Sequence, residues 1–148
     1  MYKHILLPTD GSKLSAKAVK QGIQFAKSIG AKVTALHVTP LYRTMMEDGF
    51  VAPAAATFRK RFEDESLKRS KAVLEGVRVE ALAAGIKCEG VSIAGDLPYD
   101  AIIKQAKKAK CDLIMMASHG RKGLSSILLG SETAKVLTHS TIPVLVVR

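Results

Sequence analysis

Residues 113–139 read LIMMASHGRKGLSSILLGSETAKVLTH, and this stretch decides the fold. The run that opens it is continuously apolar, which is typical of a strand buried on both faces of a sheet. A glycine-bearing loop follows, and residues 131–139 are predicted to form a helix. A strand, a loop and a helix in this order form the repeating unit of proteins in which helices cover a parallel sheet.

The same unit recurs along the rest of the chain. Further strands are predicted at residues 3–8, 32–38, 87–94 and 142–147, and further helices at 12–29, at about 57–84 and from 98 onward. Ser12 is positioned to cap the first helix and Gly30 to end it. The order of elements predicts an α/β fold: a single doubly wound domain over residues 1–148, with a five-stranded parallel sheet and helices on both faces.

The helix predicted at 57–84 is long and amphipathic. Its predicted core contacts are Phe58, Phe62, Leu67, Val73, Leu74, Val77 and Leu82. Residues 39–56 before it break the pattern with two prolines and a glycine, so they are predicted to form a mobile connection. Such a connection serves either as a lid or as slack before the next helix, and the sequence leaves both open.

Composition places the chain in a reducing compartment. Of its 148 residues 47% are hydrophobic and only 5% aromatic, so Ala, Val, Ile and Leu must fill the core. Cys88 and Cys111 have neither metal-ligand nor redox spacing and are predicted to be small buried hydrophobes. The N-terminal residues lack the pattern of a signal peptide, and no apolar run is long enough to cross a bilayer. The expected location is the cytoplasm.

The net charge of +10 has two interpretations. One is attraction to nucleic acid or another polyanion; the other is a set of solvated helix faces rich in lysine. The basic clusters contain no interleaved aromatic residues and match no nucleic-acid motif. We therefore favour solvated faces and do not expect a nucleic-acid partner.

Two unusual loops are predicted to meet. If the chain starts at a central strand and restarts on its other side, the first and fourth strands are neighbours, and the loops 8–12 and 117–131 share one crevice. Ligands in open α/β sheets bind at such a point, beyond the carboxyl ends of the strands.

The second loop has the groups that a phosphate needs. Its glycines allow close backbone approach, and Gly130 and Ser131 lie at a helix start, where free N–H groups favour an anion. Arg121 and Lys122 add positive charge. The spacing matches neither a Walker A motif nor a dinucleotide fingerprint, so a loop that serves only as a turn is an equal alternative. Asp10 in the first loop either accepts hydrogen bonds from a ribose or adenine or caps the turn at Ser12.

The chain resembles the universal stress protein family over its whole length. The resemblance lies in KHILLPTDGS at the start, ALHV at 35–38, IMMASHGRKGLSSILLGS at 114–131 and TIPVLVVR at the end. The nucleotide-binding branch of that family has the loop Gly-x2-Gly-x9-Gly-Ser/Thr. Gly120, Gly130 and Ser131 match its later positions, whereas Ala117 occupies the place of the first glycine. We expect this change to weaken nucleotide binding or to leave it unchanged.

The resemblance implies a Rossmann-like fold of the adenine nucleotide alpha hydrolase type and a set of ATP-binding residues. The residues implied for the base, the ribose and the sugar wall are Pro8, Thr9, Asp10, Val38, Met116 and Ala117. Those implied around the phosphates and the crevice are His119, Gly120, Arg121, Gly130, Ser131 and Glu132. The Glu132 carboxylate would repel phosphates, so it either turns outward or shares a divalent cation, Mg²⁺ or Mn²⁺, with them. The family also implies a homodimer through the last strand, 142–147.

The resemblance therefore indicates a small ATP-binding module of stress response or signalling. A hydrolase built from Ser118, His119 and Asp10 is disfavoured because no G-x-S-x-G elbow is present. ATP hydrolysis, if any, is expected to be slow. The alternative is a dimer of the same family that binds no ATP and acts as a protein-interaction scaffold.

Overall fold

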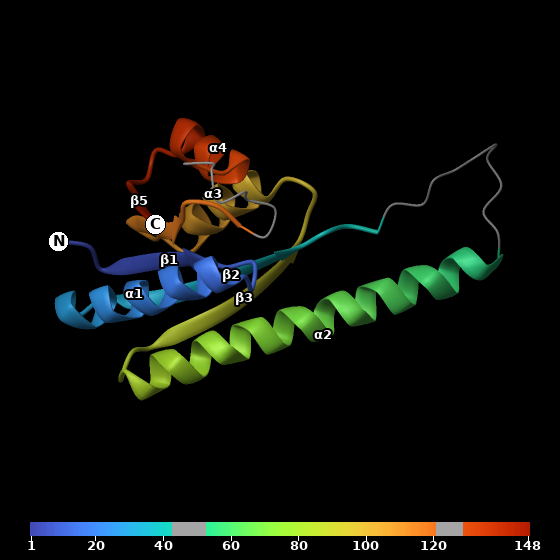
Figure 1. Cartoon of the computed structure of the whole chain (residues 1–148), viewed down its shortest axis with the longest axis horizontal. Helices are drawn as coiled ribbons and strands as arrows, with labels where there is room; N and C mark the ends of the chain where they lie inside the picture. Colours follow the sequence, from blue (N-terminus) through green and yellow to red (C-terminus); the bar gives the residue numbers. More distant parts are fainter. Residues whose placement is uncertain (43–52, 121–128) are drawn as a thin grey trace.

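The computed structural model describes residues 1–42, 53–120 and 129–148. Its elements, in chain order, are β1 (His4–Pro8), α1 (Lys13–Ile29), β2 (Lys32–Thr39), α2 (Pro53–Ala83), β3 (Cys88–Ala94), α3 (Pro98–Lys108), β4 (Leu113–Ala117), α4 (Ser131–His139) and β5 (Val144–Val147). The strands form one parallel sheet in the order β3-β2-β1-β4-β5 (Figure 1). The predicted five-stranded, doubly wound α/β fold is confirmed.

The strand order reverses in the middle of the sheet. The chain begins at the central strand β1, builds β2 and β3 on one side, and then restarts with β4 and β5 on the other. Ile5 of β1 lies opposite Leu113 of β4, so the first and fourth strands are neighbours as predicted. The carboxyl ends of β1 and β4 therefore bound the point at which ligands bind in sheets of this type.

Two apolar cores lie on the two faces of the sheet. Every residue of β1 and of β4 is buried, as the continuous apolar run at 113–117 predicted. Successive side chains of a strand point to opposite faces. Ile5 and Leu7 therefore pack with residues of α1 and α2, whereas Leu6 packs with residues of α3 and α4.

Local signals fix α1 against the sheet. The Ser12 hydroxyl accepts a hydrogen bond from the Ser15 N–H at 3.2 Å, which is the predicted N-cap. Gly30 ends the helix with φ +70°, a conformation that L side chains rarely adopt. Gly22 lets the helix approach β1, because a Cβ atom there would lie 2.5 Å from Leu7 Cδ2.

Helix α2 starts earlier than predicted and buries only part of its predicted core, Val77 among it. It begins at Pro53, so the end of the expected 39–56 connection is helical, and residues 43–52 of that connection lie outside the described residues. The predicted core contacts Phe58, Leu67 and Leu82 are wrong; Phe58 is 59% exposed and the other two are also exposed. The buried residues of the helix include Ser66, Ser70, Val77 and Ala81.

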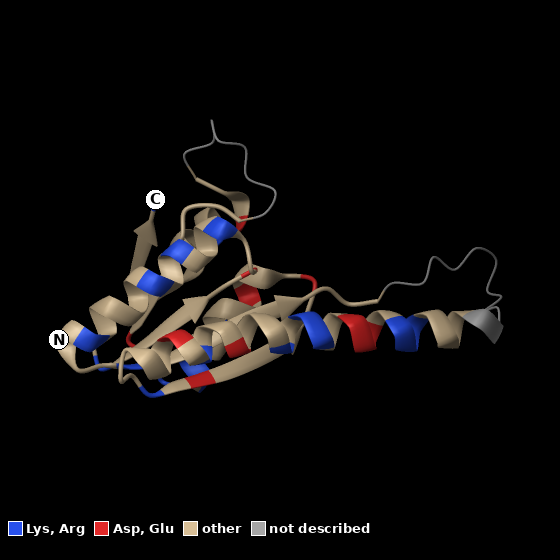
Figure 2. Ribbon diagram, turned by 60° about the horizontal axis from the view of Figure 1, so that its bottom comes forward, with Lys and Arg blue, Asp and Glu red and all other residues tan. Residues whose placement is uncertain are grey.

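The reason for this difference is the placement of α2. Its N-terminal half extends past the strands, where its side chains have no sheet to pack on (Figures 1 and 2). Where α2 does cover the sheet, the Ser70 hydroxyl donates to Ser92 Oγ of β3 at 2.7 Å and lies 3.0 Å from His37 Nδ1 of β2. A hydrogen-bonded hydroxyl can be buried at little cost, so the polar residue replaces the apolar contact.

Asp112 joins the starts of β1 and β4. Its carboxylate accepts hydrogen bonds from the backbone N–H groups of Lys3 at 2.8 Å and His4 at 2.9 Å. Burial alone would raise the pKa of Asp112, but the hydrogen bonds from His4 and Lys3 outweigh it and hold the pKa below its usual value. The carboxylate is therefore charged at neutral pH and fixes the register of the two central strands.

Basic residues lie on the outer faces of the helices. Lys13, Lys17, Lys20 and Lys27 are all exposed along α1, as Figure 2 shows. The projecting part of α2 alternates both signs of charge and contains the ion pair between Arg59 and Glu63. This pattern favours the interpretation of the net charge as solvated helix faces. Among the described helices, none is both long enough and apolar enough to span a membrane.

Candidate functional site

The loops after β1 and β4 meet at the point where the strand order reverses. A Cβ atom built on Gly120 would collide with Oδ2 of Asp10, so the backbone of one loop lies against the carboxylate of the other. Asp10 and Gly120 are 110 positions apart in numbering, and only the adjacency of β1 and β4 brings them together. The predicted convergence of the two loops is confirmed.

Asp10 has one of the two roles that the sequence left open, that of capping the turn at Ser12. Its Oδ1 accepts a hydrogen bond from the Ser12 N–H at 2.9 Å and so holds the turn that starts α1. The same residue lines a cavity of about 310 Å³. The other residues that line this cavity are His37, Val38, Thr39, Pro40 and Arg69. Val38, predicted as a site residue, thus lies beside Asp10.

Pro8 and Thr9 lie on the interior side of this turn. Pro8 is the last residue of β1 and is buried. The Thr9 hydroxyl lies 3.0 Å from Ser15 Oγ and accepts a hydrogen bond from the Gly11 N–H at 3.2 Å. The Thr9 side chain therefore positions the Asp10 turn from inside the protein.

Met116 and Ala117 end β4 with their side chains in opposite cores. Met116 belongs to the core between the sheet and α3 and α4, and Ala117 to the core between the sheet and α1 and α2. The Ala117 carbonyl accepts a hydrogen bond from Thr133 Oγ1 at 3.0 Å, which ties the strand to α4. The methyl group that replaces the first motif glycine is thus packed in the core.

The two ends of the loop between β4 and α4 lie close together, with Gly130 packed against Ser118 and His119. The Gly130 N–H donates to the Ser118 carbonyl at 2.7 Å, and a Cβ atom on Gly130 would lie 3.0 Å from His119 Cα. Ser118 Oγ lies 3.2 Å from His119 Nδ1. Ser118 is only 2% exposed, so its hydroxyl is a poor candidate for a nucleophile that must reach a substrate.

The start of α4 lacks a side-chain cap among the described residues. Gly130 is the N-cap, and the Ala134 N–H donates to the Gly130 carbonyl at 2.9 Å. The N–H groups of the first turn, beginning at the exposed Ser131, therefore precede the helical ladder, and such groups favour an anion. Arg121, predicted to add positive charge here, lies outside the described residues.

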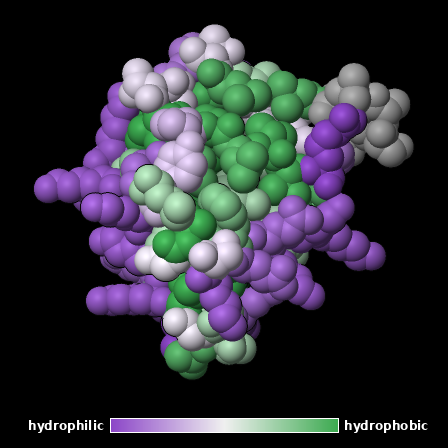
Figure 3. Space-filling view, turned by 90° about the vertical axis from the view of Figure 1, so that its left-hand side faces the viewer, coloured by the Kyte–Doolittle hydropathy of each residue, from purple (hydrophilic) through white to green (hydrophobic). Residues whose placement is uncertain are grey.

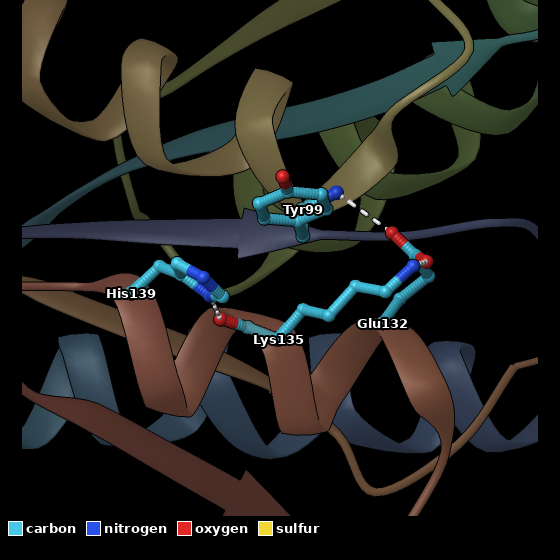
Figure 4. A network of polar contacts seen from close by, with 4 residues as sticks. All are labelled: Tyr99, Glu132, Lys135 and His139. Carbon is cyan, nitrogen blue, oxygen red and sulfur yellow. Dashed lines mark hydrogen bonds and ion pairs between the residues drawn. The ribbon is translucent and has the colours of Figure 1, made fainter.

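Glu132 has the outward orientation that the sequence left open. Its Oε2 accepts a hydrogen bond from the Tyr99 N–H at the start of α3 at 2.9 Å, and its Oε1 pairs with Lys135 Nζ at 3.0 Å (Figure 4). The carboxylate thus stabilises the N-terminus of α3, whose own N-cap residue, Leu97, makes no side-chain hydrogen bond. Within the described residues, no group of three or more His, Cys, Asp or Glu side chains is arranged to hold a metal ion.

Sequence reasoning missed Arg69 and His37. Arg69 reaches the cavity from α2, and its guanidinium lies 3.4 Å from Ser66 Oγ. Its position follows from how α2 docks on the sheet, so no local signal indicated it. His37 lies within the ALHV segment, but its hydrogen bond to Ser70 joins residues that are distant in the sequence.

A second cavity, of about 410 Å³, lies beside α3 and is larger than the one at Asp10. Volume alone does not identify a site. The smaller cavity is bounded by Asp10, the end of β2 and α2, and the Asp10 carboxylate also meets the Gly120 backbone at the point where the strand order reverses. We therefore take the crevice between β1 and β4 as the candidate site.

Fold and crevice together define a class of protein: a doubly wound α/β domain with a helix start and two converging loops at the switch point of its sheet. The sequence model of the universal stress protein family matches residues 1–148. Universal stress protein MJ0531 of Methanocaldococcus jannaschii is 34% identical over the whole chain and 83% of its own length.

Solved structures agree with this match. The structure of the hypothetical protein MJ0577 superposes with a TM-score of 0.82 at 33% identity, covering 99% of this chain and 96% of that one. A universal stress protein in complex with cAMP superposes with a TM-score of 0.71 at 27% identity, covering 99% and 97%. The chain belongs to the universal stress protein family.

Proposed function

We propose that this protein binds an adenine nucleotide, ATP, in the crevice between β1 and β4 and acts as a small nucleotide-responsive module in stress response or signalling. One observation carries the proposal: the Asp10 carboxylate meets the Gly120 backbone beside the open start of α4. The complex of a related universal stress protein with cAMP supports the same ligand class. Any turnover of ATP is expected to be slow in this proposal.

Each part of the crevice suits one part of the nucleotide. A carboxylate accepts hydrogen bonds from ribose hydroxyls, which gives Asp10 its role. Val38 lies at the end of β2 beside Asp10 and offers its backbone to the base. Gly120 and Gly130 keep the backbone clear for the phosphates, and the first N–H groups of α4, from Ser131 onward, receive their negative charge.

Arg69 extends the base pocket in this proposal. It brings a guanidinium to the wall formed by α2, opposite the residues of β2. A guanidinium stacks on a flat aromatic ring and remains charged at all physiological pH values. Arg69 therefore covers the face of the adenine, and Pro8, Thr9, Met116 and Ala117 support the pocket from below without donating side-chain groups to the ligand.

A divalent cation, Mg²⁺ or Mn²⁺, would be held mainly by the phosphates of the nucleotide. Glu132 contributes little to it, since both of its oxygens already accept hydrogen bonds from Tyr99 N–H and Lys135 Nζ. Charge neutralisation by the bound cation would add to that of the helix start.

The test is the melting temperature of the full chain with and without millimolar ATP and magnesium. Ligand at about one hundred times its dissociation constant adds ~2.7 kcal/mol to the free energy of unfolding, which is a clear rise in Tm. GTP serves as the comparison for base selectivity. No rise with ATP overturns the proposal.

Two variants locate the site. Asp10→Asn keeps an oxygen that accepts from the Ser12 N–H, so the turn survives while the charge is lost, and we expect the ATP-dependent rise in Tm to shrink. Asp64→Asn, an exposed change on the projecting part of α2, is the matched control and should retain the full rise. An equal rise in both variants places the nucleotide elsewhere.

The second candidate function is that of a dimeric interaction scaffold without ATP, and one observation favours a dimer. β5 is an edge strand of the sheet, and its Leu145 is 43% exposed. Figure 3 shows apolar surface gathered on the side of the molecule where Figure 1 places β5. An exposed apolar edge strand readily pairs with another chain. We propose that residues 142–147 meet the same strand of a second copy, whether or not ATP is bound.

A further inference from the structure

The cavity beside α3 lies apart from the crevice between β1 and β4. It has a volume of about 410 Å³ and lies between the carboxyl end of β3 and the outer side of α3. The residues that line it are Ile93, Ala94, Gly95, Asp96, Leu97, Asp100, Ala101, Lys104, Gln105 and Lys108. Its volume is within the range of small-molecule sites.

The cavity exists because α3 has two faces. One face carries Ile102, Ile103 and Ala106, which pack in the core against the sheet. The other carries Ala101 and Gln105, which follow at helical spacing and line the cavity. β3 is the edge strand on this side, so its Ile93 forms part of the floor without a further strand beside it.

Gln105 is the unexplained group in this cavity. The residue is only 7% exposed, yet its side-chain amide makes no hydrogen bond with any residue that the structure describes. The residue lines the cavity, and its amide is not fully enclosed, so a ligand in the cavity can reach the side chain. Buried polar side chains nearly always have a partner, and an amide of this kind can both donate and accept.

The charged residues along the cavity change from acidic at the start of α3 to basic toward its end. Asp96 and Asp100 lie toward the start of α3, and Lys104 and Lys108 toward its end. Lys104 pairs with Asp100 at 2.7 Å, whereas Lys108 has no ion pair within the described part of the chain. With a rise of about 1.5 Å per residue, Asp100 and Lys108 are separated by roughly 12 Å along the helix axis.

We propose that this cavity is a second binding site, and that its ligand is a short zwitterionic peptide with an apolar side chain. The carboxylate of the peptide pairs with Lys108, a peptide amide exchanges hydrogen bonds with the Gln105 amide, and the amino group lies at the acidic end. The apolar side chain packs on Ile93 and Leu97. A distance of roughly 12 Å corresponds to about three extended residues at ~3.3–3.6 Å each.

Other small ligands fit this arrangement less well. A nucleotide or a sugar phosphate carries at least two negative charges, whereas the cavity contains two carboxylates and, beside the Lys104 that pairs with Asp100, only one further lysine, Lys108. A purely apolar molecule would leave the Gln105 amide without a partner, which is costly once water is excluded. A peptide satisfies both the amide and the two oppositely charged ends.

The test uses the full chain and the tripeptide Ala-Leu-Ala as the probe, in two-dimensional ¹⁵N–¹H NMR titrations. We expect saturable shifts of the Gln105 side-chain NH₂ signals and of backbone signals in α3. The same tripeptide with acetylated and amidated ends should bind at least tenfold more weakly, because it lacks both charges. No saturable shift up to millimolar tripeptide overturns the proposal.

Three variants make the test specific. Gln105→Leu and Lys108→Gln should each weaken tripeptide binding tenfold or more. Lys107→Gln is the matched control, because Lys107 is exposed on the same helix but does not line the cavity. Equal binding by all three variants overturns the proposal.

Gln105→Leu also has a readout that does not depend on a ligand. Since the amide has no described partner, its replacement by an apolar side chain of similar size should leave Tm unchanged or raise it. A marked fall in Tm contradicts the premise that the amide is free for a ligand. Because α3 and β3 form this cavity, the ATP-dependent rise in Tm should persist in Gln105→Leu, which separates this proposal from that of the nucleotide site.

Discussion

Gly120 lies where the loops after β1 and β4 approach closely, whereas Gly76 has open space around it. A Cβ atom on Gly120 would collide with the Asp10 carboxylate, whereas one on Gly76 in α2 would meet no atom within 4 Å. Gly120→Ala should therefore turn the carboxylate aside, lower stability by about 1 kcal/mol, the lower limit for overpacking, and abolish the ATP-dependent rise in Tm.

Gly76→Ala is the control for that substitution. Alanine in a helix interior is favoured over glycine by roughly 0.5–1 kcal/mol, so this variant should be more stable and should retain the full response to ATP. Urea unfolding measures the stabilities, and thermal melts measure the response. If Gly120→Ala responds to ATP as the parent does, the Asp10 carboxylate is not a ligand contact.

The buried Cys111 provides a prediction on the pH dependence of its reactivity. Burial raises the pKa of the Cys111 thiol to about 11, and the residue is 5% exposed. At pH 8 only about one thousandth of a group with that pKa is thiolate, the form that reacts. We expect Cys111 to resist iodoacetamide in the folded protein and to react once urea unfolds it, as mass spectrometry of the labelled peptides would show.

The same shift has a consequence for stability. Below about pH 8.5, the ordinary pKa of a cysteine, the Cys111 thiol is neutral in both the folded and the unfolded state. Its raised pKa in the folded state therefore does not change the free energy of unfolding there. As the pH rises from there toward 11, the unfolded state ionises first and folding loses free energy. Cys111→Ala should lose less stability than the parent over this window; identical pH profiles would contradict the shift.

At the level of single residues, sequence and structure agree where a motif fixes the spacing. Gly120, Gly130 and Ser131 were predicted to line the crevice; the structure places Gly120 against Asp10 and Gly130 and Ser131 at the start of α4, and their contact with a nucleotide stays a prediction. Arg69 could not be predicted, because a residue on a long amphipathic helix reaches a cavity only through the angle at which the helix docks.

Among the elements, α2 depends on hydrogen bonds as well as on apolar burial. The fully buried Ser70 donates to Ser92 Oγ and therefore accepts from His37 Nδ1, so one hydroxyl joins α2, β3 and β2. Ser70→Ala removes a hydrogen-bond partner of the buried His37 and of the exposed Ser92 and should cost about 1–3 kcal/mol in urea unfolding.

Ser28→Ala is the matched control for Ser70→Ala. Ser28 is exposed, and its hydroxyl bonds only a nearby carbonyl within α1, that of Phe25, so its loss should change stability by at most about 0.5 kcal/mol. Amide hydrogen exchange should accelerate in α2 of the Ser70 variant. Equal losses in the two variants would show that the buried hydroxyl contributes nothing specific.

Helix α2 also shows why an apolar pattern can mislead. The prediction placed Phe58, Leu67 and Leu82 in the core because they are the large apolar residues of the segment. In the structure, burial depends on which side of the helix meets the sheet and on how far the helix extends past it. On the buried side, Ser70 has hydrogen-bond partners in β2 and β3, and those partners are far away in the sequence.

For the whole molecule, the edge strand β5 is the proposed contact between two copies. If residues 142–147 form the dimer contact, Leu145→Lys places a charge on that edge and should convert the dimer to a monomer, as light scattering after size-exclusion chromatography would show. Leu82→Lys, an exposed change on α2, is the control and should leave the mass unchanged. A parent that is monomeric at micromolar concentration would contradict the proposed contact.

The topology of the molecule could be predicted more completely than its sites. Alternating strands and helices permit few arrangements, since crossovers are right-handed and a buried strand such as β4 must lie in the interior of the sheet. The cavity beside α3 was not predicted, because Gln105 has the same spacing as an ordinary helix residue and its missing partner is visible only in three dimensions.

The contact between Glu132 and the Tyr99 N–H has a consequence for the order in which the molecule assembles. Helix α3 lacks a cap of its own, and the group that completes its first turn belongs to α4, 33 positions later in the chain (Figure 4). During synthesis, α3 therefore emerges with a frayed start and becomes complete only when the last helix folds back onto it. Native contacts between distant segments form slowly, so the final step of folding should finish α3, order the start of α4 and close the crevice together.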